Sequence, residues 1–167
     1  MSKTSSRPTA IVTGAGGGIG RGIALALARA GWDLAFTHFN TPVEAATLAD
    51  ELRALGAEVH FAECDAGDRA QVESFYRSVA DWCEAPDLLV NNAGIQTWSA
   101  LLELEEADWD RVIRTNLKGC FLNTQAAGRL REARGRGGAI VTVASGSNKL
   151  AFPHRVDYTA STGGIEQ

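Results

Sequence analysis

Residues 10–20 read AIVTGAGGGIG, a short apolar stretch of β-strand type that runs into a cluster of glycines and then into a helical pattern over 21–30. A turn this rich in glycine lets the backbone approach a bulky anion, because no Cβ stands in the way. The helix that follows points its free N–H groups and the positive end of its dipole toward the same place. This succession of strand, glycine turn and helix N-terminus indicates a site for the pyrophosphate of a dinucleotide.

The spacing of the glycines leaves an alternative open. Glycines 14, 18 and 20 follow the pattern G-x3-G-x-G, which differs from the G-x-G-x-x-G of the usual dinucleotide fingerprint. A flexible turn packed closely under a helix is the other interpretation. We favour the phosphate site because the flanking strand and helix are both readable in the sequence.

Length and composition predict one domain over residues 1–167 with an ordinary core. Hydrophobic residues make up 45% and charged residues 22%, and the net charge of −4 gives no electrostatic reason to expect a nucleic acid or an anionic membrane as partner. The three cysteines, Cys64, Cys83 and Cys120, show no metal-ligand or redox spacing, so we expect free thiols and no metal site. Residues 1–8 are polar, no signal-peptide core follows, and no run reaches membrane-spanning length, so we expect a cytoplasmic protein.

The hydrophobic pattern alternates between short apolar runs and helical periods, which predicts βαβ units. The expected fold is therefore an α/β, Rossmann-type, doubly wound parallel sheet with both faces covered by helices. The helix over 19–30 is apolar on most faces, so we expect it to pack broadly against the sheet, and we expect Thr41 and Glu44 to form a capping box at the next helix. The predicted strands are 9–12, 34–39, 59–62, 88–90 and 139–143, and the predicted helices are 19–30, 42–55, 69–82, 105–133 and 158–167.

Four polar or glycine-rich segments follow predicted strands. They are the glycine turn, Asp65, the segment 91–94 (NNAG) and Ser145. With right-handed crossovers, the carboxyl ends of parallel strands meet at one edge of the sheet, and ligands of such folds bind there. The sequence thus predicts one binding site at this edge.

These segments, together with Asn116 in TNLKG (115–119) and Tyr158 in YTAS (158–161), resemble the motifs of the short-chain dehydrogenases/reductases. The resemblance extends from Thr9 to Gln167 and includes the 13-residue separation of Ser145 and Tyr158. Within that family the chain looks most like 3-oxoacyl-carrier-protein reductases and sugar or polyol dehydrogenases. The resemblance implies an oxidoreductase that transfers hydride between the nicotinamide of NAD(P) and a small-molecule carbonyl or secondary alcohol.

The resemblance also implies roles for individual residues. Tyr158 would exchange a proton with the substrate oxygen, Ser145 would hold that oxygen by a hydrogen bond, and Asn116 would anchor the polar network behind the tyrosine. Asp65 would accept from the adenine amino group and Asn91 would steady the cofactor. Taken alone, Asp65 also reads as a turn residue, Asn116 as a polar kink and Tyr158 as a helix-start aromatic. The implied cofactor-binding residues are Thr13, Gly14, Gly18, Ile19, Gly20, His38, Asp65, Asn91, Ala93 and Gly94.

One position departs from the family pattern. Family members carry a lysine four residues after the tyrosine, on the same face of the helix, and here that residue is Thr162. The lysine would lower the proton affinity of the tyrosine and bond the nicotinamide ribose, whereas a threonine hydroxyl is neutral and too short. Losing tuned acid–base chemistry costs about 10²–10⁴ in rate. A catalytically impaired or silent nucleotide-binding module is therefore the alternative function.

The second departure concerns length, because the family continues beyond this point with further strands and a loop over the substrate. We expect the chain to be a fragment in which the C-terminal strands are missing. The long helix over 105–133 serves dimer contacts in the family, so a homo-oligomer through this helix, or a scaffold subunit, is a further expectation.

The choice of dinucleotide is partly readable. The predicted second strand ends in THFN (37–40) without the carboxylate that usually binds a free 2′-hydroxyl. This absence favours NADP over NAD, with His38 or Asn40 near the phosphate. No arginine or lysine stands at 15–17 or 37–40, so NAD also stays open.

Overall fold

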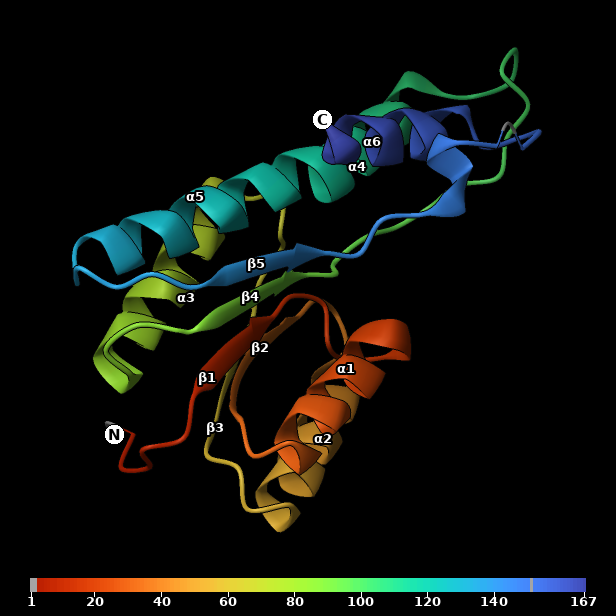
Figure 1. Ribbon diagram of the computed structural model, residues 1–167. Coiled ribbons are helices and arrows are strands. Elements are labelled where there is room, and N and C mark those ends of the chain that lie inside the picture. Colours follow the sequence, from red (N-terminus) through yellow and green to blue (C-terminus); the bar gives the residue numbers. More distant parts are fainter. Residues whose placement is uncertain (1–2, 151) are drawn as a thin grey trace.

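The computed structural model describes residues 3–150 and 152–167 and contains a five-stranded parallel sheet between two layers of helices (Figure 1). The strand order β3-β2-β1-β4-β5 confirms the predicted doubly wound α/β fold. The strands are β1 Thr9–Val12, β2 Asp33–His38, β3 Val59–Glu63, β4 Leu88–Asn91 and β5 Ala139–Thr142. The helices are α1 Gly18–Arg29, α2 Pro42–Ala54, α3 Arg69–Trp82, α4 Glu106–Ile113, α5 Gly119–Glu132 and α6 Val156–Glu166.

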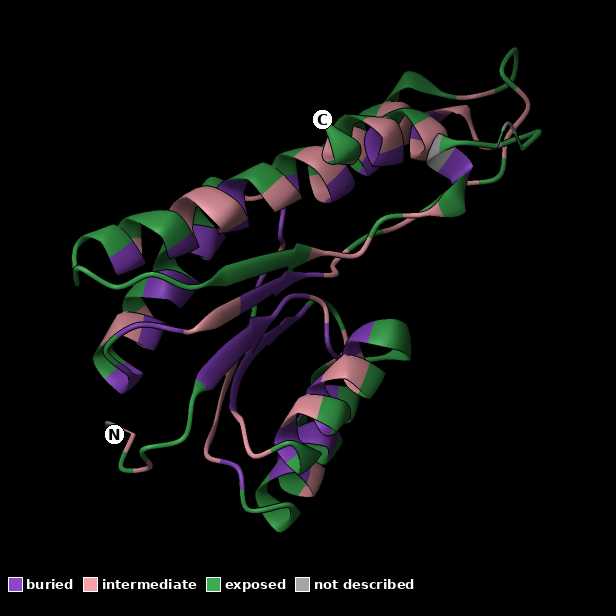
Figure 2. Cartoon of the chain, viewed as in Figure 1, coloured by how far each residue is buried: buried purple, intermediate pink, exposed green. Residues whose placement is uncertain are grey.

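The central strands alternate their side chains between two apolar cores. On one face Val12 and Phe36 pack with α1 and α2, and on the other Ile11, Ala35 and Leu89 pack with α3 and α5. Figure 2 shows β1 and β2 buried along their length, which explains why they read as continuous apolar runs. Figure 1 shows α1 and α2 on one side of the sheet and α3 and α5 on the other. With the strands parallel, all their carboxyl ends reach the same edge.

Helix α1 packs on the core through Ala24, Leu25 and Ala28, while Ile19 in its first turn is 66% exposed. One local expectation was wrong. Thr41 precedes α2 as expected, but its side chain makes no capping hydrogen bond. Its hydroxyl instead lies against Gly16 in the glycine turn, where an added Cβ would be only 2.2 Å away. Packing between two loops has thus replaced the local cap.

The helix predicted over 105–133 is interrupted in its middle. Between α4 and α5 the chain adopts a π-helical turn, Arg114–Lys118. Such turns insert an extra residue into a helix and redirect the side chains around it. Here the turn carries Asn116, which is buried. The irregular turn is the polar kink considered for this residue, and the same turn places Asn116 at the site described below.

Strand β5 forms an edge of the sheet, as the sequence predicts, and most of it is exposed (Figure 2). Ile140 and Val141 are 44% and 51% exposed. An apolar edge strand presents free N–H and C=O groups to other chains.

The thiols of Cys64 and Cys83 are buried, and desolvation raises their pKa to about 12 and about 11. In the unfolded chain thiols ionise near pH 8.5. Because the folded pKa values are higher, the contribution of each buried thiol to stability is fully present below about pH 8.5. It is lost as the pH rises toward the folded pKa, and the free energy of unfolding then falls by at most about 1.4 kcal/mol per pH unit for each thiol. We therefore expect the free energy of unfolding in urea to fall between pH 8.5 and 10.5.

The double substitution C64A/C83A tests this origin. It should flatten the alkaline decline, whereas Val79→Ala, which removes buried volume from the same core without a thiol, should lower stability at every pH and leave the slope unchanged. A slope as steep in C64A/C83A as in the parent chain would assign the decline to other groups.

Candidate active site

A cavity of about 960 Å³ lies at the carboxyl edge of the sheet. The loops after β1, β2, β3, β4 and β5 line it, together with the π-helical turn and α6. The cavity lies at the edge of the sheet where the sequence predicts a binding site. Ten of the predicted residues line this cavity: Gly14, Gly18, Ile19, His38, Asp65, Ala93, Gly94, Asn116, Tyr158 and Thr162.

The glycine turn and the segment after β4 are bonded into one unit. Gly14 has a φ of +66°, and a Cβ on it would lie 2.8 Å from the Cα of Ala93, so a side chain is excluded twice. The Thr13 hydroxyl accepts hydrogen bonds from the backbone N–H groups of Asn92 and Ala93, both at 3.0 Å. In return the Asn92 amide donates to the carbonyls of Thr13 and Gly14, at 2.9 and 3.1 Å. Thr13 therefore holds the two segments together from behind the cavity wall.

Asn92 is a residue that the sequence reasoning missed, although it stands inside the quoted NNAG segment. Its side chain lies so close to Gly20 that a Cβ there would be 2.4 Å from the amide nitrogen. Gly20 is buried beneath the glycine turn, where the Asn92 amide leaves no room for a side chain. The motif carried the signal, but only the packing shows that the second asparagine clamps the turn.

The cavity side of the turn fits the pyrophosphate of a dinucleotide. A Cβ on Gly17 or Gly18 would meet no atom within 4 Å, so the backbone there is open to the cavity. Helix α1 begins after Gly17 with no side-chain cap and no acidic residue in its first turn. Its first N–H groups and the positive end of its dipole are therefore available to an anion.

The carboxylate of Asp65 is held on both oxygens. One oxygen accepts from the Gly67 N–H at 2.9 Å, and the other forms an ion pair with Arg114 at 2.7 Å. Arg114 also lines the cavity and was missed, because it comes from a helix 49 residues further along the chain. No local sequence pattern predicts a contact between residues so far apart in the chain. Asp65 thus lines the cavity with a guanidinium beside it.

Asn116 joins the end of the cavity near Tyr158 to the loop after β4. Its side chain accepts from the Ile95 N–H at 2.8 Å and donates to the Ile95 carbonyl at 2.9 Å and to the Ser161 hydroxyl at 3.0 Å. Since Asn116 is buried, these bonds fix the loop against α6. The role that the resemblance implies for Asn116, anchoring the polar network behind Tyr158, stays a prediction.

Thr162 lines the same cavity one helical turn after Tyr158. Its hydroxyl donates to the carbonyls of Tyr158 and Thr159 in its own helix, at 3.0 and 3.2 Å. A threonine bonded back to its helix presents its methyl group rather than a donor to the surroundings. The side chain is only 3% exposed.

Besides Thr13 and Gly20, two more predicted residues, Ser145 and Asn91, are not among the residues that line the cavity. The Ser145 hydroxyl caps the short turn Gly146–Asn148, accepting from the Ser147 N–H and donating to the Ser147 hydroxyl, both at 3.2 Å. The Asn91 amide donates to Thr124 on α5 at 2.9 Å, on the helix side of β4. The roles assigned to Ser145 and Asn91 stay predictions.

The end of β2 contributes His38, Phe39, Asn40 and Thr41 to the cavity. His38 is buried, and its Nδ1 has no hydrogen-bond partner among the described residues. The nearby carboxylate of Glu63 on β3 accepts from the Asn40 N–H at 3.2 Å. Residues 37–40 contribute no arginine or lysine, as the sequence indicates.

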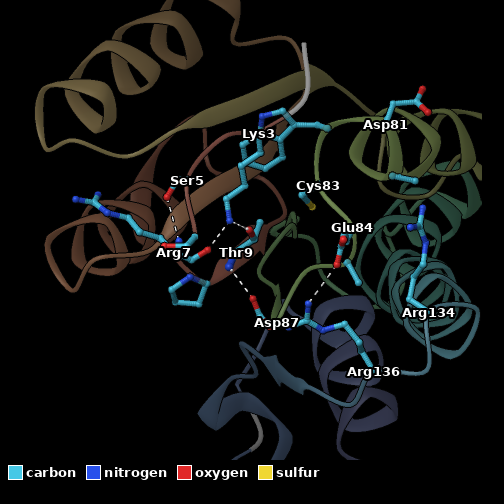
Figure 3. Close-up of a pocket in the computed structure, with 15 residues that line it drawn as sticks. Lys3, Ser5, Arg7, Thr9, Asp81, Cys83, Glu84, Asp87, Arg134 and Arg136 are labelled. Carbon is cyan, nitrogen blue, oxygen red and sulfur yellow. Dashed lines mark hydrogen bonds and ion pairs between the residues drawn. The ribbon is translucent and has the colours of Figure 1, made fainter.

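A second cavity, of about 600 Å³, lies at the opposite, amino edge of the sheet (Figure 3). Its charged groups engage one another. The Lys3 ammonium bonds Asp33 and Thr9, at 3.2 and 2.8 Å, and Arg136 pairs with Glu84 and Asp87. None of the predicted site residues lines it.

Within residues 3–150 and 152–167, no three His, Cys, Asp or Glu side chains gather closely enough to hold a metal ion. In the same ranges, no helix is both long and apolar enough to cross a bilayer.

Comparisons with known proteins agree with this geometry. Residues 8–167 match the family model described as short chain dehydrogenase. A 3-oxoacyl-[acyl-carrier-protein] reductase of Staphylococcus aureus is 35% identical over 157 residues, which is 94% of this chain and 63% of that protein. The chain therefore spans less than two thirds of the length of this relative.

Solved structures give the same match. A 3-oxoacyl-[acyl-carrier protein] reductase from Brucella melitensis, solved in complex with NAD, superposes with a TM-score of 0.90 at 35% identity, covering 97% of this chain and 65% of that one. A short-chain type dehydrogenase/reductase from Mycobacterium marinum gives a TM-score of 0.90 at 31% identity, covering 95% and 64%.

Proposed function

This chain belongs to the short-chain dehydrogenase family, and we propose that it binds NAD(P) and acts in hydride transfer between the nicotinamide and a carbonyl or secondary alcohol. One observation carries the proposal: the open glycine turn, Asp65, Asn116 and Tyr158 all line one cavity at the carboxyl edge of the sheet. Each of these groups, taken alone, has a structural explanation. A purely structural role does not explain why all of them line one cavity of dinucleotide size.

The residues divide the work along the cavity. The N–H groups at the start of α1 would bind the pyrophosphate, and Asp65, oriented by Arg114, would accept from the adenine amino group. A nicotinamide bound at the other end would supply or accept the hydride. Tyr158 would give the substrate oxygen its proton, and Asn116 would hold the adjoining loop in place.

We infer a preference for NADP, since the segment 37–41 at the end of β2 carries no carboxylate to bind a free 2′-hydroxyl. We take short 3-oxoacyl thioesters as the first substrates to test, because two of the relatives are named as 3-oxoacyl-carrier-protein reductases. Ser145 is the remaining group assigned to the substrate oxygen, and turning its hydroxyl from Ser147 toward the cavity would bring it into that role.

A second candidate function rests on Thr162. Its hydroxyl is engaged within its own helix, and so the position supplies neither charge nor a free donor to the cavity. A protein of this kind would bind the nucleotide without turning over a substrate.

The experiment compares Tyr158→Phe with the parent chain. Removing the phenolic proton donor should lower NADPH oxidation with an acetoacetyl thioester by at least about 10²-fold while leaving the nucleotide Kd within about twofold. The product is identified by mass spectrometry. Equal rates in the two proteins would remove Tyr158 from the chemistry, and nucleotide binding without turnover in either would favour the second candidate.

A further inference from the structure

Two segments meet near the start of α6, the helix that carries Tyr158 (Figure 1). One follows β4 and contains Trp98, and the other precedes α6 and ends at Arg155. The Ser99 N–H donates to the His154 carbonyl at 3.1 Å, and the Thr97 hydroxyl donates to the Asp157 carboxylate. These bonds hold the two segments together beside Tyr158, next to the residues that line the cavity.

Arg155 lies among aromatic rings where these segments meet, and one of the rings, Tyr158, lines the cavity. Its guanidinium carbon is 3.8 Å from the centre of the Trp98 ring and 5.9 Å from the centres of the Phe152 and Tyr158 rings. Trp98 and Phe152 are 63% and 47% exposed, so the cluster opens to solvent. Aromatic faces hold a guanidinium in place and remove part of its hydration without neutralising its charge.

The charge of Arg155 is not used inside the chain. Within the described residues it forms no ion pair, and its Nε is buried without a hydrogen-bond partner. The neighbouring carboxylate, Asp157, is engaged by Thr97 and by the Tyr158 N–H at 2.7 Å. His154, directly before Arg155, has a φ of +63°, a conformation costly for a non-glycine residue. The backbone is thus strained at the residue that positions this cation.

We propose that Arg155 is an oxoanion-binding residue that selects substrates carrying a carboxylate or phosphate group beside the reacting carbonyl or alcohol. The inference rests on the proposed function, because Tyr158 defines where the reacting oxygen lies. A guanidinium presents paired N–H donors that match the oxygens of either anion. A partly dehydrated one binds such a group more tightly than an exposed one does.

The test is calorimetric titration of the 167-residue chain, with and without NADP, using two matched pairs of probes. The pairs are 4-oxopentanoate with its methyl ester, and dihydroxyacetone phosphate with dihydroxyacetone. We expect at least one anion to bind about tenfold or more tighter than its neutral partner, and the better pair identifies the anion.

Substitutions assign the preference to one side chain. Arg155→Met should abolish it, Arg155→Lys should retain part of it, and the exposed Arg129→Met on α5 should leave it unchanged. Equal binding of anion and neutral partner, binding of none of the four probes, or a preference that survives in Arg155→Met would overturn the inference.

Failure of the inference and failure of the proposed function give different results. A chain that binds NADP but does not distinguish anion from ester contradicts only the role of Arg155. A chain that selects anions through Arg155 but binds no nucleotide contradicts only the proposed function.

Discussion

Replacing Thr162 by lysine is expected to raise the rate of carbonyl reduction by about 10²–10⁴. Thr162 lies one helical turn after Tyr158 and lines the cavity, so a longer side chain from the same Cα enters the space beside the phenol. An ammonium group there would stabilise the phenolate form and could bond the ribose of a bound nucleotide. The threonine hydroxyl, turned back to the Tyr158 carbonyl, does neither.

The matched control is Thr162→Met, because a methionine side chain is similar in length to a lysine side chain and carries no charge. Both substitutions must fit a site that is 3% exposed, so both should lower the melting temperature, and the lysine more because its charge is desolvated. Initial rates of NADPH oxidation with an acetoacetyl thioester separate them. A lysine variant no faster than the methionine variant would contradict a damaged enzyme and favour a nucleotide-binding module.

The second large effect is expected at Gly17, where stability and binding should change in opposite directions. Gly17 is the N-cap of α1, its extended backbone accepts any residue, and a Cβ there meets no atom within 4 Å. Gly17→Asp should therefore cap the helix and raise the free energy of unfolding by about 0.5–1 kcal/mol. The same carboxylate should repel the pyrophosphate and occupy its N–H donors, weakening nucleotide binding by about 100-fold or more.

Gly17→Asn is the control, because it caps the helix with the same shape and no charge. It should bind the nucleotide more tightly than the aspartate variant does, and added salt should narrow the gap between the two. Thermal unfolding and fluorescence titration provide both readings. Undiminished binding by the aspartate variant would place the phosphates away from this helix.

The sequence predicted the architecture well because the central strands are buried on both faces and read as continuous apolar runs. The glycine turn follows from local rules of backbone conformation. The predictions that depended on one helix alone were less reliable. Thr41 had a cap sequence, but contact with Gly16 across the loop decided where its hydroxyl lies.

The parts of the site that the sequence did not reveal come from tertiary contacts. Arg114 pairs with Asp65 only because the π-helical turn lies beside the loop after β3. Asn92 bonds the glycine turn only because β1 and β4 are neighbours in the sheet. Arg155 meets Trp98 across two loops. None of these pairs has a characteristic spacing along the chain.

We propose that the cavity at the carboxyl edge of the sheet binds a nicotinamide dinucleotide. The most direct test is a fluorescence titration of the purified, folded chain with NADPH and with NADH, exciting the nicotinamide and following its emission. We predict saturable binding of both at one site, tighter for NADPH and weakened in Gly17→Asp. Absence of saturation by either nucleotide, in a sample whose circular dichroism shows the native fold, would contradict the claim.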